Sequence, residues 1–218
     1  MQQRLVQSLG YIGLASPNID QWKMFAQDML GMEVNTSPNG SIALKMDDKY
    51  HRYLIEPSPK SGLQFMGFDA GEPFLLHQLE KHLTQAGIEV HSTSSEEKKT
   101  KNVTDLIWVN DPDGVRVDFY SGLQEAASPF KPIKPIGGFV TGELGMGHIV
   151  RYTPNYKKMS DFYQRILRFS LSDFHDQPYA IEFLRTNPRH HSIGLIDDKG
   201  PPRLHHTMVE YRYRSEER

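Results

Sequence analysis

The fold of this chain is decided by LGYIGLASPNIDQWKMFAQDMLGM at residues 9–32, which returns as MGHIVRYTPNYKKMSDFYQRILRF at residues 146–169. An offset of 137 residues aligns the two stretches without a gap. It pairs Gly10 with Gly147, Pro17 with Pro154, Asn18 with Asn155, Phe25 with Phe162, Gln27 with Gln164, Leu30 with Leu167 and, further on, Ala43 with Ala180. This self-similarity predicts that one folding unit occurs twice.

The second copy differs from the first by carrying histidines. The same offset aligns Tyr11 with His148 and Leu54 with His191. An offset of 141 residues aligns Phe65 with His206. Six of the ten histidines lie between His148 and His206, and clustered histidines are typical of metal sites. We therefore expect a metal site in the second copy and none in the first.

Hydrophobic periodicity predicts an alternation of strands and helices in the first copy. The expected strands are 9–16, 42–47, 50–56, 63–69, 88–91, 106–110 and 115–120, and the expected helices begin near Asp20 and at Pro73 and end at Gly31 and Gly87. Residues 111–114, Asp-Pro-Asp-Gly, predict a turn, and residues 96–99 predict a solvated loop. These elements form two successive β-α-β-β units, each with a further short strand.

The second copy predicts the same order with its helix after Pro154 and strands at 179–184, 190–196 and from Arg203 onward. We expect an N-terminal domain of two modules without metal at residues 1–127, a linker rich in proline and glycine at 128–140, and a metal-binding domain at 141–218. Residues after Tyr211 have no apolar face. We expect the second domain to be incomplete and the chain to be truncated at its C-terminus.

Composition excludes several classes of function. The formal net charge of −2 gives no electrostatic basis for binding nucleic acid. No run of about 18 apolar residues predicts a membrane span, and the polar N-terminus does not resemble a secretory signal. The chain has no cysteine, which excludes disulfides, cysteine-ligated zinc and a cysteine nucleophile. We expect a cytoplasmic protein that acts on small molecules.

Three histidines on three separate predicted strands form the candidate site. A non-haem iron centre of the facial type needs two imidazoles and a carboxylate on one side of the metal. His148, His191 and His206 fit this need, because alternate side chains of a strand point to one face. In the adjacent pairs 190–191 and 205–206 one ring must point outward, so one member of each pair is expected to be inert. Glu143 is a loop acid whose simplest interpretation is solvent exposure.

Several motifs, taken in order, resemble the type I extradiol ring-cleavage dioxygenases of the vicinal oxygen chelate superfamily. The resemblance is strongest to the two-domain members that cleave 2,3-dihydroxybiphenyl. The motifs that carry it are SLGYIG at 8–13, PF at 129–130, GGFVTG at 137–142, GELGMGHIV at 142–150, FL at 183–184, NPRHHS at 187–192 and RLHHTMVE at 203–210. The resemblance covers the chain up to about Tyr211 and implies an α+β fold of tandem βαβββ modules.

The family resemblance also implies roles for single residues. It places two metal ligands at His148 and His206, the catalytic acid–base at His191, and the lining of the substrate and dioxygen pocket at Phe183 and Val150. The third ligand of the family is a glutamate, whose counterpart in the first domain is Asp118 and which would lie beyond Arg218.

The implied activity is extradiol cleavage of a catechol by O2 in aromatic-compound degradation. The implied cofactor is Fe(II), with Mn(II) suited to the same ligands, and the implied assembly is a homo-oligomer. Two alternatives stay open: a glyoxalase-like metal isomerase, and an inactive truncated product or non-catalytic binding member of the same fold. Dioxygen consumption with a catechol distinguishes a ring-cleaving dioxygenase from both alternatives.

Overall fold

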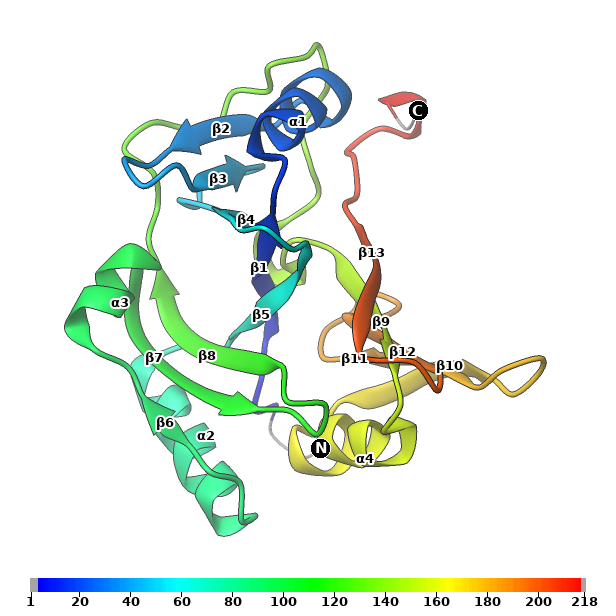
Figure 1. Cartoon of the computed structure of the whole chain (residues 1–218). Helices are drawn as coiled ribbons and strands as arrows, with labels where there is room; N and C mark the ends of the chain where they lie inside the picture. The colour runs from blue at the N-terminus through cyan, green and yellow to red at the C-terminus, as the bar shows by residue number, and fades with distance from the viewer. Residues whose placement is uncertain (1–3, 217–218) are drawn as a thin grey trace.

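A computed structural model describes residues 4–216 and shows two β-sheets with short helices around them (Figure 1). The eight strands of the first sheet run in the order β2 (Glu33–Thr36), β3 (Ile42–Lys45), β4 (Tyr53–Pro57), β1 (Ser8–Ser16), β5 (Gly62–Asp69), β8 (Arg116–Leu123), β7 (Val103–Asn110) and β6 (His91–Ser92). The five strands of the second sheet run in the order β10 (Ser170–His175), β11 (Ile181–Arg185), β12 (Ile193–Asp197), β9 (His148–Thr153) and β13 (Arg203–Met208).

Helical segments connect the strands. They are α1 (Ile19–Met24) continuing as the π-helix η1 (Phe25–Leu30), α2 (Pro73–Gln85), α3 (Ser95–Thr100), the 3₁₀ turn η2 (Gly142–Leu144), α4 (Tyr156–Asp161) continuing as the π-helix η3 (Phe162–Ile166), and the 3₁₀ turn η4 (Arg214–Glu216). Within residues 4–216 no helix is long and apolar enough to cross a membrane.

The strand order confirms the repeat that the sequence predicts. In the first sheet β1 pairs with β4 in parallel and with β5 antiparallel. In the second sheet β9 pairs with β12 in parallel and with β13 antiparallel. The series β2-β3-β4-β1-β5 therefore corresponds to β10-β11-β12-β9-β13, and the mixed α+β fold agrees with the vicinal oxygen chelate fold.

The alignment of Leu54 with His191 is wrong, because β10 and β11 together are three residues longer than β2 and β3, with six and five residues against four and four. In the first sheet Leu44 pairs with Tyr53, and in the second Leu184 pairs with Ile193. Both partners are displaced by 140 residues rather than 137. The equivalence of Ala43 with Ala180 is wrong for the same reason, and Ala43 corresponds to Phe183.

The hydrogen bonds before β4 and β12 show which residue truly matches His191. The amide of Arg52 donates to Leu44 over 2.8 Å, and the amide of Ser192 donates to Leu184 over 2.8 Å. Arg52 therefore corresponds to Ser192, and the counterpart of His191 is the histidine at position 51.

Some elements differ from the sequence prediction. β12 begins at Ile193, so the expected strand at 190–196 is a loop over its first three residues. Residues 96–99 belong to helix α3 rather than to a loop, because the side chain of Ser94 caps this helix by accepting from the amide of Glu97. Strand β10 was not expected. Arg168 takes the left-handed conformation, φ 61°, that Gly31 takes in the first copy at φ 75°.

The two sheets share one hydrophobic core. Phe68 of β5 packs against Phe119 of its own sheet and against Tyr163 and Phe169, with ring centroids 5.6 to 6.4 Å apart. The buried apolar cluster likewise includes residues of both sheets, among them Leu9, Ile149 and Leu195. Between β8 and η2 the chain runs over residues 124–141 without a helix or strand of its own (Figure 1).

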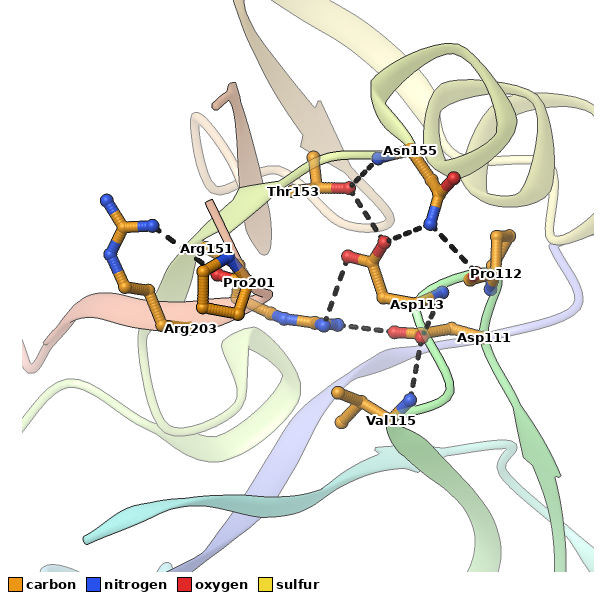
Figure 2. Close-up of polar contacts among 9 residues, drawn as sticks. All are labelled: Asp111, Pro112, Asp113, Val115, Arg151, Thr153, Asn155, Pro201 and Arg203. Carbon is orange, nitrogen blue, oxygen red and sulfur yellow. Dashed lines mark hydrogen bonds and ion pairs between the residues drawn. The ribbon is translucent and has the colours of Figure 1, made fainter. Parts of the chain in front are cut away.

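Polar contacts reinforce the junction at the β7–β8 turn. Figure 2 shows Asp111 and Asp113 of this turn facing Arg151, Thr153 and Asn155, which lie on β9 and just after it. Arg151 points into this junction, whereas His148 and Val150 belong to the opposite face, because alternate residues of a strand face opposite ways. The core therefore fixes β9 from one side and leaves its other face for the site.

Candidate metal centre

The candidate centre lies where β9 and β13 run side by side. In this antiparallel pair Val150 is opposite His206 and His148 is opposite Met208. The register shifts between Leu204 and His206, and His206 consequently shares a face with His148. His148 is buried at the start of β9, whereas His206 is exposed, so the pair is open to solvent on the β13 side.

The two imidazoles are spaced for a common metal ion. The Nε2 atoms of His148 and His206 lie 3.2 Å apart. Two nitrogens that each bind a metal at about 2.1 Å and at about 90–100° to one another would be about 3.0–3.2 Å apart. The observed spacing therefore fits two adjacent ligands of one ion.

His191 lies beside this pair but in the loop before β12 rather than on a strand. Its ring stacks on that of His148, with centroids 3.8 Å apart and planes inclined by 29°. Its Nδ1 lies 2.9 Å from Nδ1 of His190. Among the residues that the structure describes, none hydrogen-bonds its buried Nε2. An unpartnered buried nitrogen is costly unless a ligand satisfies it, so this atom is available to a bound molecule.

Desolvation favours the neutral form of all three imidazoles, although to a different extent in each. Desolvation, aided by the neighbouring His191 and His206, lowers the pKa of His148 to about 3. Desolvation and then His190 lower the pKa of His191 to about 4. Desolvation and then His205 lower the pKa of His206 as well. Neutral imidazole is the form that binds metals and accepts protons.

Phe183 and Val150 line the same face. The ring of Phe183 on β11 lies 4.8 Å from that of His191. Gly194 on β12 separates Phe183 from Val150, and a Cβ at Gly194 would lie 2.9 Å from a Val150 methyl group and 3.6 Å from the Phe183 ring. The glycine thus leaves room in front of both side chains.

The structure does not bring a carboxylate to the histidines. Within residues 4–216 no three His, Cys, Asp or Glu side chains form a group that could hold a metal ion. Glu143 lies on η2, where its exposed side chain takes no part and its backbone carbonyl accepts from Asn187. The Nδ1 of His190 lies against the Nδ1 of His191, and the Nδ1 of His205 lies against the Nδ1 of His206.

The corresponding positions in the first sheet hold no second imidazole pair. Tyr11 corresponds to His148 and Phe65 to His206, and the Tyr11 hydroxyl donates to Asp118 over 3.0 Å. The ammonium group of Lys101 contacts the buried carboxylate of Asp118 and lies 3.7 Å from the centroid of the Phe65 ring. A cation of the protein itself, the Lys101 ammonium group, therefore lies among the first-sheet positions that correspond to His148 and His206.

His51 completes this resemblance between the two copies. Its ring lies 5.0 Å from that of Tyr11, as the ring of His191 lies against that of His148. It is fully buried, and within residues 4–216 neither ring nitrogen has a hydrogen-bond partner. Burial, with the charges of Arg52 and Lys101, lowers its pKa to about 3. An ungapped alignment of the sequence with itself misses this match, because the second copy has a three-residue insertion before it.

Comparison with known proteins agrees with this geometry. Residues 9–57 match a family profile described as "Dihydroxybiphenyl dioxygenase BphC D1", and residues 145–215 match "Glyoxalase/Bleomycin resistance protein/Dioxygenase superfamily". The chain is 34% identical to biphenyl-2,3-diol 1,2-dioxygenase of Metapseudomonas furukawaii, over 94% of this chain and 70% of that protein. The chain belongs to the extradiol dioxygenase family.

The chain is also similar in sequence and structure to other extradiol dioxygenases. A 3-methylcatechol 2,3-dioxygenase of Pseudomonas putida is 30% identical over 94% of this chain and 73% of its own length. The crystal structure of a halotolerant catechol dioxygenase superposes with a TM-score of 0.91 at 28% identity and covers 97% of this chain and 72% of that one. Extradiol dioxygenases use a non-haem metal ion and cleave catechols in aromatic degradation. The expected family, fold and enzyme class are therefore confirmed.

Proposed function

We propose that this chain provides the Fe(II)-binding face of an enzyme that cleaves the ring of a catechol beside its two hydroxyl groups. The observation that carries the proposal is the 3.2 Å spacing of the His148 and His206 Nε2 atoms, with the unpartnered Nε2 of His191 next to them. The names of the relatives support a substrate with two adjacent hydroxyls on an aromatic ring.

His148 and His206 would hold the metal ion. Desolvation lowers the pKa of His148 to about 3 and also lowers the pKa of His206, which favours the neutral rings that bind metal. A bound Fe(II) would lower the pKa of the catechol hydroxyls and bring the substrate and O2 together. Imidazole and carboxylate donors also suit Mn(II), so Fe(II) is the assignment that metal analysis of the active protein tests.

The third ligand that the resemblance implies is a glutamate. Its proposed place follows from the first sheet, where Gly67 on β5 lies between Tyr11 on β1 and Asp118 on β8. Met208 on β13 corresponds to Gly67, because it is paired with His148 as Gly67 is paired with Tyr11. A glutamate on a strand parallel to β13 and next to Met208 would therefore reach the two histidines.

His191 would move the proton. Its neutral Nε2 is buried and free to accept a proton from a catechol hydroxyl and to return it later in the reaction. Phe183, whose ring lies 4.8 Å from His191, would pack against the aromatic ring of the substrate. Val150 would line the pocket next to the metal, since it lies opposite His206 and two residues after His148 on the same face of β9.

Oxygen consumption tests the proposal. The protein is loaded with Fe(II) under nitrogen and mixed with 2,3-dihydroxybiphenyl in air-saturated buffer, and O2 uptake and the yellow ring-cleavage product are recorded. We expect one O2 per catechol, and the loss of product with His191→Gln at unchanged Fe(II) content. Stoichiometric Fe(II) without O2 uptake overturns the proposed activity.

A separate experiment addresses the third ligand, because no carboxylate joins the histidines within residues 4–216. A protein that binds no Fe(II) is tested again after fusion, at Tyr211, to the corresponding C-terminal segment of the Paraburkholderia xenovorans relative, which is 34% identical to this chain. Activity of the fusion that depends on His148 and His206 supports the assigned ligands. Activity that survives both alanine substitutions contradicts them.

A further inference from the structure

One buried guanidinium group contacts each of the three segments that carry the histidines. Arg189 has only 6% of its side chain exposed. Its Nε donates to the carbonyl of Leu144 over 3.4 Å, one Nη donates to the carbonyl of Val140 over 3.1 Å, and the other Nη pairs with the carboxylate of Glu210.

Each contact lies a short distance along the chain from one histidine. Leu144 precedes His148 by four residues, Glu210 follows His206 by four, and Arg189 itself precedes His191 by two. The backbone of Glu210 also accepts from the amide of Val140 over 2.8 Å. The guanidinium group thus joins the start of β9, the end of β13 and the loop before β12.

Asn187 supports the same arrangement from the same loop. Its side-chain amide lies within 3.2 to 3.4 Å of the carbonyls of Gln7, Glu143 and Leu144, and its Oδ1 accepts from the amide of Arg189 over 3.0 Å. Asn187 is also buried. The loop that bears His191 is therefore held by side-chain hydrogen bonds rather than by a strand ladder.

We propose that Arg189 is a positioning residue that sets the mutual placement of His148, His191 and His206 through its contacts with Leu144, Val140 and Glu210. Its relevance to catalysis rests on the proposed function of these histidines. Arginine suits this role because its planar fork presents several fixed donors, whereas a lysine ammonium cannot reach three acceptors in the same directions. Groups around metal ligands typically change metal affinity by about 10–100-fold when they are removed.

Co(II) binding and histidine NMR test the assignment. The variants are Arg189→Lys, Arg189→Gln and Glu210→Gln, and the control is Arg203→Gln. Arg203→Gln also removes an ion pair, the one between Arg203 on β13 and Asp198. Both side chains of this pair are partly exposed. Co(II) affinity and the visible absorption spectrum report on the His148–His206 pair, and far-UV circular dichroism verifies that each variant is folded.

We expect the Arg189→Lys and Arg189→Gln proteins to bind Co(II) about tenfold more weakly with an altered spectrum. Glu210→Gln should reproduce part of this loss, and Arg203→Gln should match the original protein. In the metal-free protein, the imidazole signals of all three histidines should shift together when Arg189 is changed. Glu210→Gln serves as the milder probe if both Arg189 variants fail to fold, because its side chain is 43% exposed.

The outcomes separate the positioning role from the metal site. Full Co(II) affinity in folded Arg189→Lys and Arg189→Gln proteins overturns the proposal, as does a set of imidazole signals that none of the three variants moves. If the original protein binds no Co(II), the metal assignment fails, and the imidazole shifts of the metal-free variants alone decide the role of Arg189.

Discussion

Arg151 and Asp111 form an ion pair in which neither side chain is exposed, although one lies on the second sheet and the other on the turn between β7 and β8 (Figure 2). Asp113 adds a second carboxylate to the same guanidinium, and it also accepts from Thr153 and Asn155. The turn that the sequence predicts from Asp-Pro-Asp-Gly is therefore also the polar contact between the two sheets.

Removal of one member of this pair should strongly destabilise the protein. Arg151→Met leaves two buried carboxylates without their cation, and we expect a loss of about 3–5 kcal/mol in the free energy of unfolding, measured with urea. The double variant Arg151→Met/Asp111→Asn should recover part of the loss, because it removes a buried charge. A loss below about 1 kcal/mol in the single variant would contradict the assigned role.

The Asp47–Arg52 pair should make the stability depend on pH. Burial raises the pKa of Asp47, but the charge and hydrogen bonds of Arg52 outweigh it, so the net pKa is lowered. A carboxyl whose pKa is lower in the folded state stabilises the protein above its unfolded pKa of about 3.9 and loses this contribution as the pH falls through the folded value. We expect Asp47→Asn to cost about 3 kcal/mol at pH 7. The difference from the original protein should shrink below pH 4, and an unchanged difference at pH 3 would refute the linkage.

Lys101 should stabilise the folded protein, because its ammonium group contacts the carboxylate of Asp118, which is fully buried. Lys101→Met removes the ammonium group that contacts this carboxylate and leaves Arg116 as its remaining cation. We expect a loss of about 3 kcal/mol, and recovery of part of it in Lys101→Met/Asp118→Asn. Urea unfolding of Lys101→Met, Asp118→Asn and the double variant gives the coupling energy between the two side chains. A coupling energy near zero would show that their contact does not stabilise the protein.

The approach of β9 and β13 beside His148 should require glycine at position 147. Gly147 has φ 138°, and a Cβ there would lie 1.8 Å from the carbonyl oxygen of Met208. Gly147→Ala should destabilise the protein by about 1–3 kcal/mol and weaken Co(II) binding, because β13 carries His206. Gly62→Ala is the matched control, since no atom lies within 4 Å of its added Cβ. Equal Co(II) affinity in both variants would speak against this constraint.

Metal binding and turnover should respond to different histidines. His148→Ala or His206→Ala should abolish stoichiometric Fe(II) binding, whereas His191→Ala should keep the metal and lose ring cleavage by about 100-fold or more. His77→Ala is the control, because this histidine is exposed and lies on α2. Iron analysis by atomic absorption, together with O2 uptake, checks both expectations. Loss of iron in the His191→Ala protein would assign this residue to the metal instead.

The repeat, the α+β fold and the motifs of the family could all be predicted from the amino-acid sequence. Gly10, Pro17 and Phe25 recur because the same strand and helix are built twice, and local periodicity follows from backbone geometry. His148, His191 and His206 could be named as the candidate site because imidazole is a common metal ligand and because they lie in motifs that resemble the family. None of these inferences needed contacts between distant parts of the chain.

The strand register and the contact partners of the site residues could not be predicted in this way and follow from the folded structure. The match of His191 with His51 depends on strand pairing, because a three-residue insertion shifts every later equivalence. His148 and His206, whose Nε2 atoms lie 3.2 Å apart, are 58 positions apart in the sequence. Arg151 and Asp111 are 40 positions apart. Packing and burial select such contacts from many that a pattern allows, since their energies depend on desolvation and three-dimensional distance rather than on spacing along the chain.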